Sequence, residues 1–177
     1  MGLFLYFLDF FSIIVIFIIK KMIMNQTENA YYYRDYCGRV IIVNLIETKG
    51  GKVEEALCYD SVDLLSTGLT CTAAIEVKDR SEKYMSTTIE KLGGNYIMKK
   101  KYDRMNELFK PNYDKLFFAV VFKDFIYLWD ITDKDFEWEW KYLPNTTVED
   151  TGYSWQQCSY LHLKDAVAKF NTKKYKV

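Results

Sequence analysis

The stretch that decides the fold is DSVDLLSTGLTCTAAIEVKDR, residues 60–80. It predicts two strands joined by a short turn at residues 66–70. Glu76 and Lys78 lie within the otherwise apolar second strand. Side chains at i and i+2 of a strand point to the same face, so these two groups are neighbours, and a hairpin partner brings Asp63 beside them. Charged groups in a buried strand cost free energy unless they are paired or bind a metal ion, so the pattern indicates a functional site.

Two carboxylates with an ammonium group at their edge suit a divalent metal ion and a phosphate. An aspartate, about a dozen residues, and then Glu-x-Lys on the next strand resembles the PD-(D/E)XK nuclease superfamily, which includes restriction endonucleases, phage nucleases and Holliday-junction resolvases. The resemblance implies that Asp63 and Glu76 ligate the metal ion together with the backbone carbonyl of Val77. It also implies that Lys78 is the catalytic lysine, that Mg²⁺ is the cofactor with Mn²⁺ as a substitute, and that DNA is cut to a 5′-phosphate and a 3′-hydroxyl.

The resemblance covers roughly residues 28–166. The stretch YIMKKKYDRMNELF is similar to the family's second core helix, in which Lys101 matches a further basic residue of the site. The stretch KLFFAVVFKDFIYLWDIT is similar to the late hairpin that closes the family's sheet. The implied fold is α/β, with a central mixed sheet of about four to six strands flanked by helices. The sequence departs from the family in two ways. No proline precedes Asp63, and the acidic residue of the family's first helix has no clear match. Either Glu28 or Asp35 supplies it, or both are solvated surface charges and it is missing.

Composition limits the alternatives. A chain of 177 residues, half of them hydrophobic and 18% aromatic, is large enough for one domain with a core and is not disordered. The 24 basic residues equal the 24 acidic ones, so net charge indicates no nucleic-acid partner, although a local basic patch suffices for one. Four widely spaced cysteines and a single histidine, His162, argue against a structural zinc site and indicate reduced thiols in the cytoplasm. The sequence has no Gly-rich phosphate loop, Gly-x-Ser-x-Gly elbow or paired-histidine motif, which argues against nucleotide-binding proteins and serine hydrolases.

The N-terminus poses a separate question. Residues 3–19 are almost wholly apolar and precede a lysine pair. Three interpretations remain open: a membrane anchor that holds the domain at the cytoplasmic face, a true start at Met22 or Met24, and a buried first helix. We therefore divide the chain into a leader, residues 1–24, and a single nuclease-like domain, residues 25–177.

The remaining elements follow from hydrophobic periodicity and breakers. We expect a helix over residues 25–50, where the β-branched run 40–46 fits a strand as well. The elements expected after it are strands over 52–65 and 70–78, a loop or short helix over 79–94, a helix over 98–109, strands over 115–122 and 125–131, an edge strand over 160–163 and a closing helix over 164–170.

A second Glu-x-Lys pair, Glu139 and Lys141, stands in FEWEWKYL. There Phe136, Trp138 and Trp140 alternate strictly with charged residues, which predicts an amphipathic strand with a solvated polar face. Its charges cost nothing to hold, so this pair is not the expected site. We expect the aromatic face to pack in the core, with stacking on nucleic-acid bases as the alternative.

Together these observations predict a metal-dependent endo- or exodeoxyribonuclease with a site of two carboxylates and a lysine. The alternative is a non-catalytic module with a degenerate nuclease fold, which binds nucleic acid or is tethered to a membrane through residues 3–19. A homodimer is compatible with both. A phage or mobile-element nuclease, a repair enzyme and a restriction enzyme look alike at this level.

Overall fold

The structure, a computed structural model, describes residues 26–56, 62–81, 83–144 and 152–176. Residues Asp35–Val177 form one compact unit. Its elements are α2 (Gln26–Thr48, which begins before the unit), β1 (Lys52–Glu55), β2 (Leu64–Thr67), β3 (Ala73–Asp79), α3 (Ser86–Lys91), β4 (Asn95–Met98), α4 (Lys99–Leu108), β5 (Lys115–Val121), β6 (Phe125–Asp130), β7 (Glu139–Pro144), β8 (Tyr153–Leu161) and β9 (Ala168–Asn171), with 3₁₀ turns at Leu163–Asp165 and Thr172–Lys174.

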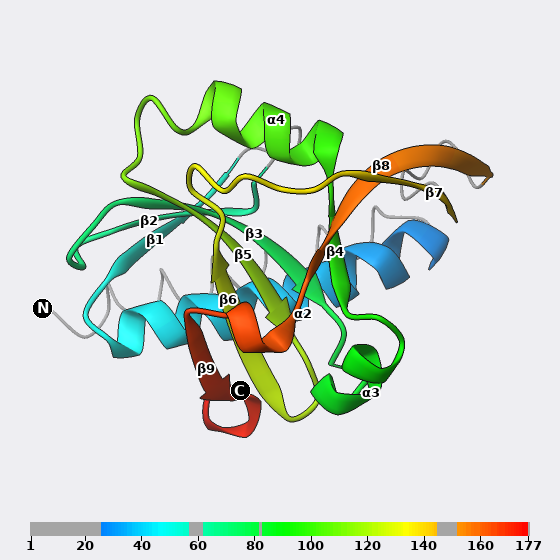
Figure 1. The fold of residues 1–177 in the computed structure, drawn as a ribbon. Coiled ribbons are helices and arrows are strands. Elements are labelled where there is room, and N and C mark those ends of the chain that lie inside the picture. The colour runs from blue at the N-terminus through cyan, green and yellow to red at the C-terminus, as the bar shows by residue number, and fades with distance from the viewer. Residues whose placement is uncertain (1–25, 57–61, 82, 145–151, 177) are drawn as a thin grey trace, which may run out of the picture. The chain divides into compact units, whose positions relative to one another are not determined.

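The main sheet has six strands in the order β1-β2-β3-β5-β6-β9 (Figure 1). Strands β3 and β5 pair in parallel, and the other neighbours pair antiparallel. A parallel pair needs a crossover, and residues 80–114 supply it, carrying α3, β4 and α4. The predicted α/β class and mixed sheet are therefore confirmed, with β3 in a central position.

One face of this sheet is covered by α2. Ile41, Ile42, Leu45 and Ile46 form one stripe of the helix and share a core cluster with Ile75 and its neighbours on alternate positions of the sheet. The spacing i, i+1, i+4, i+5 is that of an amphipathic helix. The β-branched run 40–46 is therefore helical, because burial of this stripe outweighs the weak helix propensity of valine and isoleucine.

The opposite face is covered by α4 and by a second sheet of three strands, β4-β8-β7 (Figure 1). Met105 of α4, Ile97 of β4 and Leu161 of β8 are buried in one cluster with Phe118 and Ala74 of the main sheet. The two faces of β3 thus meet different layers: alternate residues contact α2 or the layer that carries α4.

Two predictions about the strands before the site are corrected. The expected strand over 52–65 is two strands, β1 and β2, which pair with each other. The residues that join them include 57–61, which lie outside the described part of the chain. The expected strand over 70–78 begins at Ala73, and Asp63 stands immediately before β2.

The C-terminal predictions need larger corrections. Residues 160–163 do not form an edge strand, because β8 is nine residues long and lies between β4 and β7. Residues 164–170 do not form a closing helix; a 3₁₀ turn leads into β9, which is an edge of the main sheet. Strand β4, inserted before α4, was not predicted at all.

The leader, residues 1–24, lies outside the described residues, as do the membrane contact proposed for residues 3–19 and the alternative starts within it. Among the residues that the structure describes, no helix is long and apolar enough to cross a membrane. Cys71 and Cys158 are free thiols.

Candidate active site

The site forms on the face of β3 that is turned toward α4. Along β3, Ala73, Ile75 and Val77 contact the α2 layer, which leaves Glu76 and Lys78 on the other face. Glu76 pairs in register with Phe118 of β5, so a large apolar side chain lies next to its carboxylate. The sequence prediction that Glu76 and Lys78 share a face within a buried strand is therefore confirmed.

Glu76 is the centre of a cluster of charges. Its side chain is 1% exposed, and its Oε1 lies 2.8 Å from Nζ of Lys78 and 2.5 Å from Nζ of Lys101. Lys101 comes from the first turns of α4, and its side chain turns toward the sheet, as the helical spacing from Lys101 to the buried Met105 predicts. One carboxylate oxygen is thus shared by two ammonium groups from two different elements.

This environment keeps Glu76 ionised. Burial alone raises the pKa of its carboxyl, but the positive charges of Lys78 and Lys101, with their hydrogen bonds, outweigh burial and lower the pKa below the ordinary value of 4.5. Its second oxygen, Oε2, is fully buried and has no hydrogen-bond partner. A buried carboxylate oxygen without a partner is costly, so Oε2 is available to bind a ligand such as a cation.

Asp63 completes the cluster. The register that pairs Leu64 with Ile75 brings the preceding residue, Asp63, level with Glu76. The backbone N–H of Asp63 donates to the carbonyl of Ile75 at 2.9 Å, and its side-chain Oδ2 accepts from the N–H of Val77 at 2.7 Å. The carboxylate therefore takes the place of a backbone acceptor where β2 begins, which fixes its position beside the site strand.

The two carboxylates influence each other. Burial, and then the negative charge of Glu76, raise the pKa of Asp63 from 3.8 to about 7, while the Val77 hydrogen bond and the two lysines lower it less. The guanidinium of Arg39 lies 3.6 Å from Asp63 Oδ1, a loose ion pair that does not offset burial. Around neutral pH, Asp63 is therefore close to half protonated, whereas Glu76 is charged.

Arg39 was not predicted from the sequence. It lies on α2, one residue after Gly38, whose hydrogen faces β3 so closely that a Cβ at this position would lie 2.8 Å from Cβ of Asp79. The glycine lets the helix approach the strand, which brings the arginine to Asp63. Glu28 and Asp35, the two candidates for a further carboxylate from this helix, lie outside the residues whose side chains are described. The one local signal for the contact is a glycine within a helix, which ordinarily marks close packing.

The donors fit a divalent cation only in part. Asp63 and Glu76 offer carboxylate oxygens, of which Oε2 of Glu76 is buried and unsatisfied, and oxygen ligands are those that Mg²⁺ prefers. Within the described ranges, no group of three or more Asp, Glu, His or Cys side chains is placed to hold a metal ion. A cation here would therefore take its other ligands from backbone carbonyls, such as that of Val77, from water and from substrate.

The second Glu-x-Lys pair lies elsewhere. Glu139 and Lys141 are at the start of β7, the edge of the three-stranded sheet, and form an ion pair of 2.9 Å that is open to solvent. The prediction of a solvated pair is confirmed. The prediction that the aromatic face packs in the core is confirmed for Phe136 and, as a partly buried neighbour, for Trp138, but it is wrong for Trp140, which is 61% exposed. The observed strand is shorter than the predicted one: Phe136 and Trp138 precede β7, which begins at Glu139, and Trp140 lies on the strand itself, where it is exposed.

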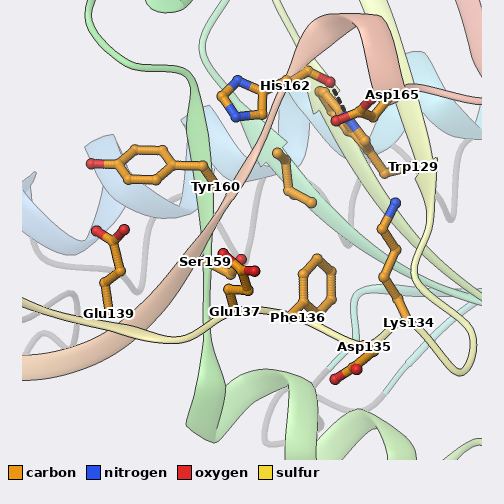
Figure 2. Close-up of a pocket in the computed structure, with 11 residues that line it drawn as sticks. Trp129, Lys134, Asp135, Phe136, Glu137, Glu139, Ser159, Tyr160, His162 and Asp165 are labelled. Carbon is orange, nitrogen blue, oxygen red and sulfur yellow. Dashed lines mark hydrogen bonds between the residues drawn. The ribbon is translucent and has the colours of Figure 1, made fainter.

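A cavity of about 270 Å³ lies between residues 129–139 and the end of β8 (Figure 2). The indole of Trp129 donates to the carbonyl of His162 at 2.8 Å on its wall. Four of the lining side chains are acidic and one is a lysine, so the cavity repels a phosphate. It contains none of the residues of the Glu76 cluster.

Comparison with known proteins adds no assignment. No protein-family model matches the chain. No curated protein matches it either.

Proposed function

We propose that this chain is a metal-dependent nuclease that hydrolyses phosphodiester bonds of DNA, with a restriction endonuclease-like core around β3. The observation that carries the proposal is the cluster itself. A fully buried Glu76 stands next to Asp63 and shares one oxygen with Lys78 and Lys101, which come from separate elements. Such an arrangement is costly to bury, and perturbed carboxylates with convergent lysines are typical of catalytic sites.

Asp63, Glu76 and the carbonyl of Val77 would hold Mg²⁺, with Oε2 of Glu76 as the oxygen that no protein group satisfies. When bound, the cation would polarise the scissile phosphate and lower the pKa of a water molecule. The chain's own contribution is positioning. The Val77 N–H fixes the carboxylate of Asp63, and Glu76 holds both lysines at the site.

The two lysines have different roles in this proposal. Lys78 lies on the site strand beside Glu76, so it would orient the attacking water and stabilise the negative charge that develops on the phosphate. Lys101 stands near the N-terminus of α4, whose N-cap residue Met98 makes no side-chain cap hydrogen bond. The helix dipole and the ammonium group therefore both favour an anion there, and Lys101 would contact the phosphate.

The test is cleavage of a panel of DNA substrates (duplex, single-stranded and branched) in Mg²⁺, in Mn²⁺ and in EDTA. We expect products with 5′-phosphate ends in either metal ion and none in EDTA. Lys78→Ala, purified in parallel, should remain folded and lose cleavage. Cleavage that persists in EDTA, or equal cleavage by Lys78→Ala, would refute the proposal.

One observation favours a second candidate, a non-catalytic nucleic-acid-binding module with a degenerate site. The cluster is already largely satisfied by its own lysines and by the Val77 N–H, so it is compatible with a purely structural ion pair network. Thermal unfolding separates the two candidates, because a ligand that binds the native state raises its melting temperature. A nuclease site predicts that Mg²⁺ or Mn²⁺ stabilises the wild type and not Asp63→Ala; no shift in either protein favours the module.

A further inference from the structure

Four large aromatic side chains are exposed together on the outer half of the β7–β8 hairpin. Trp140, Tyr142, Tyr153 and Trp155 are between 58% and 65% exposed. The Tyr142 ring lies 5.6 Å from the rings of both Tyr153 and Trp155. We call these four residues the aromatic platform. Exposed aromatic groups of this size commonly mark a binding surface.

The register shows how the platform arises. Tyr142 pairs with Trp155, and Pro144 pairs with Tyr153, so the side chains stand on one face of the hairpin. Further along β8 the same face carries Leu161, which is buried in the core. The hairpin projects past β4 and the start of α4 (Figure 1). The face that is buried near Leu161 is therefore exposed to solvent at the other end of the hairpin, where the aromatic platform lies.

We propose that the aromatic platform binds the unpaired bases of single-stranded DNA and guides that strand to the Glu76 cluster. The inference rests on the proposed function for its choice of DNA as the ligand, and it deepens that function by naming the substrate class. Aromatic rings on a strand pair are stacking surfaces for bases, and binding to them is tolerant of sequence. In a duplex the bases already stack on one another, so a platform of this kind favours an unpaired strand.

Charge at the base of the platform supports nucleic acid over other occupants. Met98 pairs with Cys158 of β8, and Lys99, Lys100 and Lys101 follow Met98 directly. Nζ of Lys99 lies 5.6 Å from the centre of the Trp138 ring. Trp155 is three residues from Cys158, about 10 Å along the strand. A chain of bases on the platform would therefore place its phosphates near these three lysines, of which Lys99 is paired with Asp103 and Lys101 with Glu76.

Of the acidic groups nearby, Asp103 is paired with Lys99 at 2.7 Å. Glu139 is paired with Lys141, and both lie on the face of β7 opposite Trp140 and Tyr142. A hydrophobic partner protein would use the rings but has no need of the lysines of α4, one of which ends at Glu76. Continuity from the rings to the proposed phosphate site is the reason to prefer DNA.

The experiment is fluorescence anisotropy with fluorescein-labelled dT20 and the full chain in EDTA, where the proposed cleavage is silent. We expect Tyr142→Ala and Trp155→Ala each to weaken binding about 5- to 100-fold. Trp155→Phe should restore most of the affinity, because it keeps the stacking face. Leu92→Ala, which removes an equally exposed side chain far from the hairpin in sequence, should bind like the wild type.

The same proteins are then assayed for cleavage in Mg²⁺. Both proposals are supported if Lys78→Ala alone loses cleavage and the platform variants keep the wild-type kcat but have a raised KM on single strands. Weakened dT20 binding by the platform variants without any cleavage by the wild type would sustain the platform and refute the nuclease. Wild-type affinity of Tyr142→Ala and Trp155→Ala for dT20 overturns the platform whatever the cleavage result. So does a loss of dimerisation or of vesicle binding in those variants without any change in dT20 affinity.

Discussion

The chain carries the same short pattern, Glu-x-Lys, in two strands, and only one of them lies in a buried cluster of charges. Glu76–Lys78 and Glu139–Lys141 both form ion pairs, of 2.8 and 2.9 Å. The Glu76 side chain is 1% exposed, whereas that of Glu139 is 60% exposed. The inner pair has a second lysine and a second carboxylate around it, and the outer pair has water.

The comparison teaches that burial gives the pattern its chemical meaning. At Glu139 water solvates both charges, and an exposed ion pair contributes little to stability. At Glu76 desolvation makes each charge depend on the others, so that the pKa of Glu76 falls while that of Asp63 rises. The following predictions test this difference, from the largest expected effect to the smallest.

The largest difference is in activity. Lys78→Ala should lower kcat for Mg²⁺-dependent cleavage at least about 100-fold, since one preorganised group that stabilises transition-state charge contributes about that much. Lys141→Ala, the matched change in the outer pair, should leave kcat unchanged. Both are measured on the same DNA under saturating substrate. Equal losses in the two variants would mean that neither lysine acts in the reaction.

Stability should separate the two glutamates. Glu76→Gln removes the charge that holds two ammonium groups, so we expect the free energy of unfolding to fall by about 2–4 kcal/mol at pH 8. The lysines are partly exposed and can turn outward, which keeps the loss moderate. Glu139→Gln should unfold like the wild type. Urea titrations followed by circular dichroism provide the measurement. An unchanged free energy of unfolding for Glu76→Gln would show that the charge of Glu76 does not contribute to stability.

Removing the charge of Asp63 should raise the free energy of unfolding at pH 8, whereas removing that of Glu76 lowers it. Its pKa is about 7 in the folded state and about 3.8 in the unfolded state, so its stabilising effect is complete below pH 3.8 and is lost as pH rises through 7. A pKa difference of about three corresponds to at most about 4 kcal/mol in the free energy of unfolding, and partial exposure of the side chain reduces this to about 1–3 kcal/mol. Asp63→Asn in EDTA should therefore be more stable than the wild type at pH 8 and nearly equal to it at pH 4. A constant difference across this range would contradict the raised pKa.

The smallest effect should be the coupling within the outer pair. In a double-mutant cycle of Glu139→Gln and Lys141→Ala, the interaction term should be indistinguishable from zero at high salt, because exposed charges are screened. The cycle on Glu76 and Lys78 should retain its coupling in the same buffer. A salt-sensitive inner pair would show that water reaches Glu76.

The site was predictable from sequence because its geometry is local. The i, i+2 rule places Glu76 beside Lys78, and one helical turn places Lys101 on the side of Met105 that faces the sheet. Strands β5 and β6 were predictable for a similar reason, since a tight turn joins two apolar runs. In each case a short stretch contains the whole signal.

The rest depended on contacts that the sequence does not display. Strand β4 is four residues long and directly precedes a helix, so its period is too short to detect. Strand β9 looks helical by composition, but it is held by pairing with β6, far away in sequence. Arg39 reaches Asp63 only because Gly38 allows α2 to approach β3. Exposure of Trp140 depends on where the core ends, and strand alternation alone does not encode that limit.

The parallel pairing of β3 with β5 ties the chemistry to the order in which the chain folds. Lys101 belongs to the excursion that the chain makes between these two strands, whereas Glu76 belongs to the first of them. The crossover between β3 and β5 is anchored at its C-terminal end only when β5 pairs with β3, and long-range parallel contacts form slowly. Lys101 therefore meets Glu76 only when the sheet is nearly complete, so a nascent chain that has not yet reached β5 carries an incomplete cluster.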